Sequence, residues 1–235
     1  MSTPSSMAPD RRSFFARLNA GAASLAALAI GGVAMAQEKS APAARWEPTR
    51  HEKDDWLDKL PGKHRLVFDT IGSNGLGEAL LFANNFINVN RADYGLQNSD
   101  LAVVIIVRHR STPFGYNDAM WAKYGAAIAA RAEVEDPKTK GAPKVNMYNS
   151  KEYAELLASR GGTLDSLFKL GVQLAVCATS TRGYARAIAE AVGGNADAIN
   201  SELIANLVSS NARMVPAGIV AVNRAQERGY SLVSV

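Results

Sequence analysis

The run Leu101-Ala102-Val103-Val104-Ile105-Ile106-Val107 decides the fold class of this chain. It is rich in β-branched residues and has no polar member, which is typical of a strand covered on both faces in a parallel sheet. Shorter apolar runs predict further strands at 66–71, 172–176, 212–215 and 231–235. The segments between them predict helices at about 76–89, 114–132, 151–160, 164–170, 181–192, 197–207 and 218–228. This alternation predicts an α/β domain with an open, mostly parallel five-stranded sheet and helices on both faces.

The first 36 residues have the layout of a secretory signal peptide. Arg11-Arg12-Ser13-Phe14-Phe15 supplies a charged start, an Ala/Gly-rich apolar stretch follows, and Ala34-Met35-Ala36 forms a small-x-small cleavage site before Gln37. The paired arginines resemble the twin-arginine type of signal. We therefore expect cleavage near Ala36-Gln37 and a periplasmic or otherwise exported protein.

A membrane anchor is the alternative interpretation of the same stretch. A membrane-spanning helix needs about 20 strongly apolar residues, and Gly31-Gly32 interrupts this run. We therefore expect no membrane span after cleavage. The segment 37–63 is polar and contains prolines, which predicts an irregular N-terminal arm before a domain at 64–235.

The composition excludes several classes of function. Removing 36 of the 235 residues takes away three arginines and one aspartate, so the net charge falls from +4 to +2. No block of lysine or arginine remains, which argues against a nucleic-acid partner. With one cysteine, Cys177, no disulfide can form within the chain, and three scattered histidines give no metal-site spacing. The sequence predicts no metal site and names no cofactor.

Three predicted strand ends carry unusual residues, and the first is the turn Gly72-Ser73-Asn74-Gly75-Leu76-Gly77. Glycines at the start of a helix allow backbone N–H groups to approach an anion. The spacing matches neither the dinucleotide pattern Gly-x-Gly-x-x-Gly nor a Walker loop. The turn is therefore either an anion site or a plain connection between a strand and a helix.

The second strand end is Arg108-His109-Arg110. A histidine between two arginines has its charged form disfavoured. His109 is therefore predicted either to exchange protons and help hold an anion, or only to bond to the backbone.

The third strand end places Cys177 directly before Ala178-Thr179-Ser180-Thr181-Arg182. A helix N-terminus together with Arg182 or Arg186 would favour the thiolate, and Thr179 or Ser180 would cap the helix or bond an anion. Simple packing of a buried thiol is the alternative. No Gly-x-Ser-x-Gly elbow or evident carboxylate pair supports a hydrolase, and the sequence does not decide whether the protein is an enzyme.

The chain from about Lys63 to the end resembles the DsrE/DsrF-like family. The matching features are the strand leading into Cys177, the segment Met214-Val215-Pro216-Ala217-Gly218, and Gln226-Glu227-Arg228-Gly229-Tyr230 before a last strand. The resemblance implies a three-layer Rossmann-like or flavodoxin-like fold and a homo-oligomer, either a trimer or a hexamer. It also implies that Cys177 accepts sulfur as a persulfide.

Three functions are compatible with these observations. The first is an exported sulfur carrier that uses Cys177, assisted by His109 and Arg182, with a sulfur donor or acceptor protein as partner. The second is a module in which the Gly72–Gly77 turn and Arg108 with Arg110 hold a small anion or nucleotide. The third is an oligomeric scaffold without catalysis.

Overall fold

The structure is a computed structural model that describes residues 47–235. The predicted signal peptide and residues 37–46 of the predicted arm lie outside the described residues.

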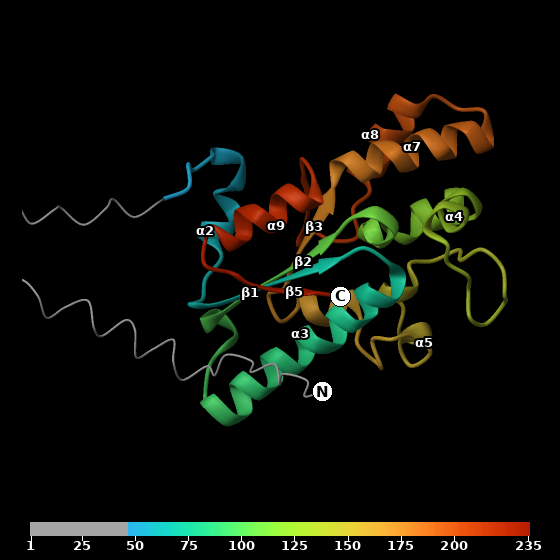
Figure 1. The fold of residues 1–235 in the computed structure, drawn as a ribbon. Helices are drawn as coiled ribbons and strands as arrows, with labels where there is room; N and C mark the ends of the chain where they lie inside the picture. The colour runs from blue at the N-terminus through green and yellow to red at the C-terminus, as the bar shows by residue number, and fades with distance from the viewer. Residues whose placement is uncertain (1–46) are drawn as a thin grey trace, which may run out of the picture. The chain divides into compact units, whose positions relative to one another are not determined.

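A five-stranded sheet forms the centre of the described chain, in the order β4-β3-β2-β1-β5 (Figure 1). The strands are β1 (His64–Thr70), β2 (Leu101–Val107), β3 (Gln173–Cys177), β4 (Ala212–Val215) and β5 (Ser231–Ser234). Every neighbouring pair is parallel. The predicted α/β class with a parallel five-stranded sheet is therefore confirmed, and the sheet is parallel throughout.

Helices fill the connections between the strands. They are α2 (Trp56–Lys59), α3 (Ser73–Tyr94), α4 (Asp118–Ala132), α5 (Lys151–Ala154), α6 (Leu164–Phe168), α7 (Ala178–Val192), α8 (Ala196–Ala205) and α9 (Gly218–Gln226). The side chain of Asn117 caps α4 by accepting a hydrogen bond from the N–H of Met120, so the helix begins later than the predicted start at 114. A 3₁₀ segment, His109–Gly115, occupies the residues after β2 instead.

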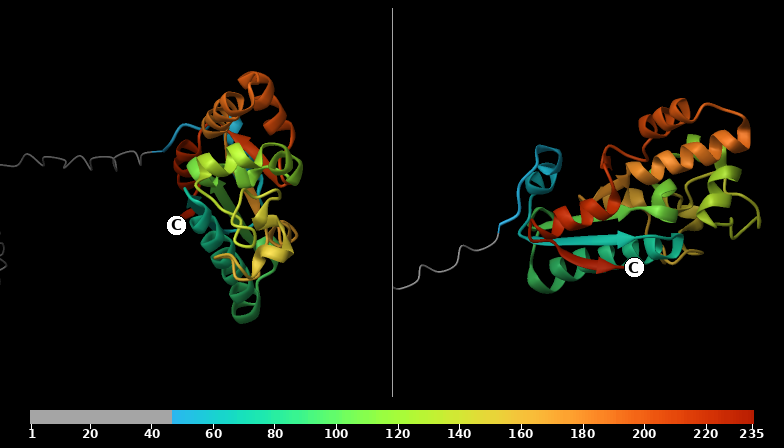
Figure 2. Two further views of the ribbon diagram at one scale, coloured as in Figure 1. Left: turned by 90° about the vertical axis from the view of Figure 1, so that its right-hand side faces the viewer. Right: turned by 45° about the horizontal axis from the view of Figure 1, so that its top comes forward.

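The direction of the connections decides which helices cover which face. From β1 to β4, each new strand lies beside the preceding one and always in the same direction across the sheet. Right-handed crossovers then place the intervening helices on one face. There α3, α4 and α7 pack on alternate strand residues such as Phe68, Ile105 and Val176. The return from β4 to β5 runs the other way, so α9 lies on the opposite face and covers Val104 and Ala175. Figures 1 and 2 show α3 and α9 on opposite sides of the sheet.

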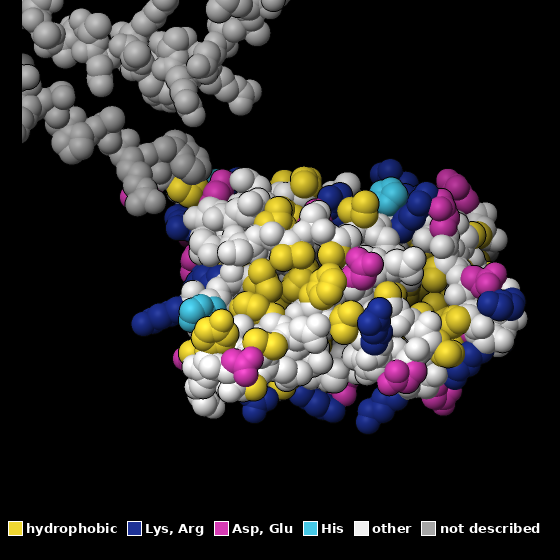
Figure 3. Space-filling model, turned by 60° about the horizontal axis from the view of Figure 1, so that its bottom comes forward, with side chains coloured by type: hydrophobic (Ala, Val, Ile, Leu, Met, Phe, Trp, Pro, Cys, Tyr) yellow, Lys and Arg dark blue, Asp and Glu magenta, His cyan; other side chains and the backbone are white. Residues whose placement is uncertain are grey.

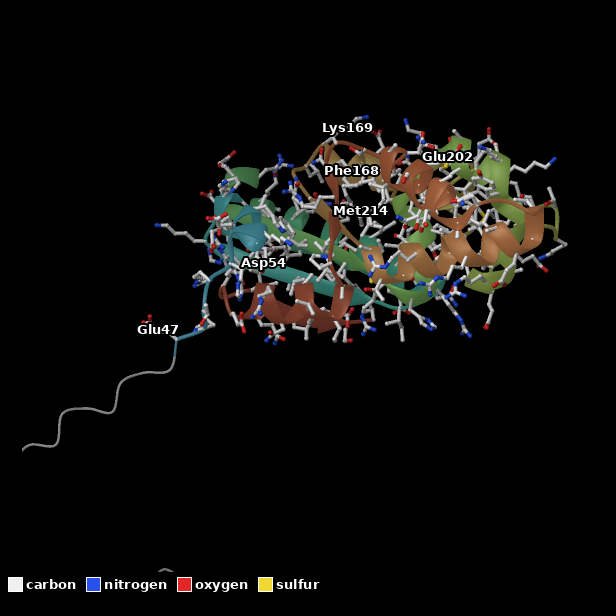
Figure 4. All side chains as sticks on the ribbon, turned by 90° about the horizontal axis from the view of Figure 1, so that it is seen from above. Glu47, Asp54, Phe168, Lys169, Glu202 and Met214 are labelled. Atoms are coloured by element: carbon white, nitrogen blue, oxygen red, sulfur yellow. The ribbon has the colours of Figure 1, made fainter. Side chains whose placement is uncertain are left out.

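The described part of the predicted arm packs beside α9. Leu57 is buried in the same cluster as α9, and its carbonyl accepts a hydrogen bond of 2.8 Å from the Tyr230 hydroxyl. The Arg228 guanidinium donates to Asp58 at 2.9 Å. Arg224 lies 3.6 Å from Asp54, which is labelled in Figure 4. These contacts fix residues 54–58 to the α9 side of the domain.

Among residues 47–235, no helix is both long enough and apolar enough to cross a membrane.

Candidate functional site

Two cavities open at the edge of the sheet where the parallel strands end, which is the usual place for a ligand in an open α/β fold. The larger cavity, about 430 Å³, is lined by the turn at Gly72–Gly75 and by side chains from the loop after α4. The second, about 170 Å³, is lined by His109, Arg110, Arg131, Ser180 and Tyr184, and we call it the cationic pocket. Arg110 lines both cavities, so the two adjoin.

Three elements bring the cationic pocket together. His109 and Arg110 begin the 3₁₀ segment after β2, Arg131 lies in the last turn of α4, and Ser180 and Tyr184 lie near the start of α7. The backbone of His109 is left-handed, with φ 56°, which is uncommon for a residue other than glycine. The Ser180 hydroxyl donates to the His109 carbonyl at 3.1 Å and ties α7 to this turn.

The two arginines of the pocket differ in their partners. Arg110 is ion-paired with the exposed carboxylate of Glu133. Arg131 has no carboxylate partner among the described residues, and its guanidinium carbon lies 5.2 Å from the centre of the Tyr184 ring. A Cβ on Gly183 would come within 2.7 Å of an Arg131 nitrogen, so the glycine leaves room for this side chain against α7. Arg131 thus lies against the Tyr184 ring, exposed to solvent and without a carboxylate partner among the described residues.

Tyr184 is buried, with 1% of its surface exposed, yet it lines the pocket. Its hydroxyl has no hydrogen-bond partner among the described residues. Burial raises the pKa of the Tyr184 phenol well above its ordinary value, and the charges of Arg131 and Arg110 only partly oppose this rise. The phenol therefore stays neutral at physiological pH and keeps its proton.

The chemistry of the pocket suits a small anion. Two guanidinium groups and a phenol offer hydrogen-bond donors, and an anion with acceptor oxygens, such as phosphate, sulfate or a carboxylate, complements them. A water needs about 15 Å³ of such space, so a pocket of about 170 Å³ has room for an anion of this size. Within the described chain, no cluster of three or more His, Cys, Asp or Glu residues could hold a metal ion.

The glycine turn lies in the larger cavity, not in the cationic pocket. Gly72 precedes α3 without a side-chain cap, so Ser73, Asn74 and Gly75 present the start of the helix to the cavity. Gly77 lines neither cavity: a Cβ there would meet Ala158 and the Tyr148 hydroxyl within 2.8 Å. Gly77 therefore serves the packing of α3.

Arg108 faces away from both cavities. It forms a two-pronged ion pair with the buried carboxylate of Asp69 on β1, at 2.7 and 2.8 Å. The hydrogen bonds that Arg108 donates to Asp69 raise the pKa of the Arg108 guanidinium. A Cβ on Gly218 would come within 2.6 Å of Arg108, which shows that the side chain packs against the start of α9. The predicted pairing of Arg108 with Arg110 around one anion is therefore not found.

Cys177 ends β3 and is only 6% exposed, and it lines neither cavity. Its sulfur accepts a hydrogen bond of 3.4 Å from the N–H of Ser180, so Cys177 itself caps α7, which begins at Ala178 and not at the predicted Thr181. Arg182 donates to the Thr179 hydroxyl at 3.1 Å.

Of the predicted site residues, His109 and Ser180 lie in the cationic pocket and Gly72–Gly75 in the larger cavity. Arg131 and Tyr184 were not predicted. Each lies on an ordinary amphipathic helix, and no local pattern marks either one, because their proximity depends on how α4 packs against α7.

Known proteins with detectable similarity do not identify a family or a ligand for this chain. No family model matches the chain, and no curated protein matches it. Among solved structures, the chain is similar to a protein of unknown function from Methanobacterium thermoautotrophicum, with 13% identity and a TM-score of 0.37. The match covers 74% of this chain and 100% of the other.

Proposed function

We propose that this protein binds a small anionic ligand in the cationic pocket. The observation that carries the proposal is the buried Tyr184 hydroxyl, which has no partner among residues 47–235 and lies beside Arg131, a cation without a carboxylate partner in the same residues. A buried polar group without a partner costs about 1–3 kcal/mol. An anion that accepts from both groups would offset this cost.

Titration calorimetry with inorganic phosphate and with sulfate tests this proposal. Arg131→Gln removes one charge and about 2 kcal/mol of charge-assisted bonding, so affinity is expected to fall about 30-fold. Arg186→Gln is the matched control, because Arg186 is exposed on α7 and lies outside the pocket. If neither phosphate nor sulfate binds, or if both variants lose affinity equally, the proposal is overturned.

A second candidate function is sulfur transfer by Cys177, as the resemblance to the DsrE/DsrF-like family implies. It is favoured by one observation: the Cys177 sulfur lies at the start of α7 and accepts a hydrogen bond from the N–H of Ser180 at 3.4 Å. In this reaction the thiolate attacks the outer sulfur of a donor persulfide. The new S–S bond forms on Cys177 as the donor S–S bond breaks, and the donor leaves as a thiolate. The small exposed fraction of Cys177 places this function second.

The sulfur proposal has its own test. After treatment with polysulfide, the intact mass is expected to rise by one sulfur atom that a reductant removes, and Cys177→Ser is expected to show no such rise. An unchanged mass in the wild type would eliminate sulfur transfer and leave the anion proposal standing.

We further propose that the protein is an exported, self-associating member of the DsrE/DsrF-like family. The pattern of residues 11–36 supports export. Self-association is supported by an apolar stripe on α3, formed by Phe82, Phe86 and Val89 at helical spacing. The trimer or hexamer is what the resemblance to the family implies. Figure 3 shows the side of the molecule on which α3 lies, where apolar side chains are exposed. Light scattering on the purified protein measures the oligomeric state.

A further inference from the structure

We infer, on the basis of the proposed anion site, that the ligand carries a single anionic group attached to an apolar body. The anionic group would occupy the cationic pocket, and the body would occupy the larger cavity next to it.

The two cavities meet at one side chain. Arg110 lines both of them, and its ion pair with Glu133 holds the guanidinium at the boundary. A ligand group bound between Arg110 and Arg131 therefore has the larger cavity, about 430 Å³, as adjoining space for the rest of the molecule. The smaller volume of the cationic pocket, about 170 Å³, leaves little room for a body of any size.

The lining of the larger cavity indicates what that body is. Ile71, Val134 and Leu157 contribute apolar surface, and Ile71 is half exposed. Covering such surface is favourable in proportion to its area. An apolar ligand body, aromatic or aliphatic, would therefore gain affinity there.

The charges of the larger cavity argue against a second anionic group. Glu133 and Glu135 both line it, and only Glu133 is paired with Arg110. Glu135 pairs with Lys140 at 3.6 Å on the exposed surface. Ionised carboxylates only accept hydrogen bonds, so Glu133 and Glu135 offer no donor to a further phosphate or carboxylate, and polyphosphates and dicarboxylates are disfavoured. The class that fits is an aryl or alkyl ester of phosphate or sulfate, or a monocarboxylate with a hydrocarbon body.

Calorimetry with inorganic phosphate and phenyl phosphate tests this inference at about pH 8, where both probes are mainly dianions. Phenyl phosphate is expected to bind at least tenfold more tightly. Ile71→Ser is expected to remove most of this advantage and to leave the affinity for inorganic phosphate unchanged. Leu156→Ser is the matched control, because Leu156 is similarly exposed, at 55%, and does not line the cavity.

The outcomes separate this inference from the proposed function. Equal affinity for the two probes, or an equal loss in the Ile71 and Leu156 variants, would overturn the inference and leave the anion site intact. Failure of both probes to bind would overturn the anion site, and the inference with it.

Discussion

The substitution Tyr184→Phe has two effects of opposite sign. In the free protein it removes a buried hydroxyl that has no partner among the described residues, so the free energy of unfolding is expected to rise by about 1 kcal/mol. In the complex it removes a hydrogen bond to an anion, worth about 1.5–3 kcal/mol. We therefore expect the affinity for phosphate to fall about 10- to 100-fold.

Together these effects reverse the order of stability when phosphate is added. At a phosphate concentration 100 times its dissociation constant, the wild type gains about 2.7 kcal/mol. A variant that binds about 30-fold more weakly gains only about 0.9 kcal/mol at the same concentration. The variant is thus expected to be more stable without phosphate and about 0.8 kcal/mol less stable with it.

Urea denaturation with and without phosphate measures this reversal, at constant ionic strength. Tyr116→Phe is the matched control: the Tyr116 hydroxyl is buried and donates to Thr181 at 2.9 Å, and Tyr116 does not line the cationic pocket. That variant is expected to lose about 1 kcal/mol under both conditions. If Tyr184→Phe behaves like Tyr116→Phe, the Tyr184 hydroxyl has no role in binding and the reasoning is refuted.

Three other substitutions test separate parts of the structure. Gly183→Ala places a Cβ where Arg131 now lies, so the affinity for phosphate, measured by calorimetry, is expected to fall. The same change raises the helix propensity of α7 by up to about 1 kcal/mol. Unchanged affinity would show that the position of Arg131 does not matter for binding. Burial alone would raise the pKa of Asp136, but hydrogen bonds from Lys138, Tyr153 and Thr139 together lower it. Asp136 therefore stabilises the fold above its unfolded pKa of about 4, and this contribution is lost as pH falls through the lower folded value. Asp136→Asn is thus expected to be less stable at neutral pH, and the difference from wild type should disappear in acid; a difference that persists at low pH would contradict this. Asp58→Ala leaves the buried Arg228 guanidinium without its carboxylate. We expect the free energy of unfolding, measured by denaturation, to fall by about 2 kcal/mol, which is below the usual cost of breaking a buried pair because Asp58 is half exposed. Unchanged stability would show that this ion pair does not anchor the arm.

The centre of the sheet was predictable because β2 is buried on both faces and its sequence is apolar throughout. The run at 101–107 forms β2 with the predicted bounds, and β4 begins and ends as predicted. Boundaries near polar turns were less predictable: α7 begins three residues early because the Cys177 sulfur caps it by accepting the N–H of Ser180, and the predicted hydroxyl cap is not used.

The side on which Arg108 and Cys177 lie follows from the alternation of strand side chains. Ile106 and Ala175 face α9, so the residues two positions later face α9 as well. The alternation along the strands therefore predicts that Arg108 and Cys177 lie on the α9 face of the sheet and not in the cationic pocket.

The rest of the candidate site depends on tertiary packing. Arg131 and Tyr184 meet only because α4 lies against α7 with Gly183 at their contact, and the left-handed backbone of His109 has no local sequence signal. Such features follow from the packing of the whole domain, and a single sequence does not reveal them.

The most direct test of the anion site is its location by NMR. In a titration of isotopically labelled protein with inorganic phosphate, we expect saturable shifts confined to the signals of His109, Arg110, Arg131, Ser180 and Tyr184 and of their immediate neighbours. Shifts scattered over the surface without saturation, or centred elsewhere, would contradict the account.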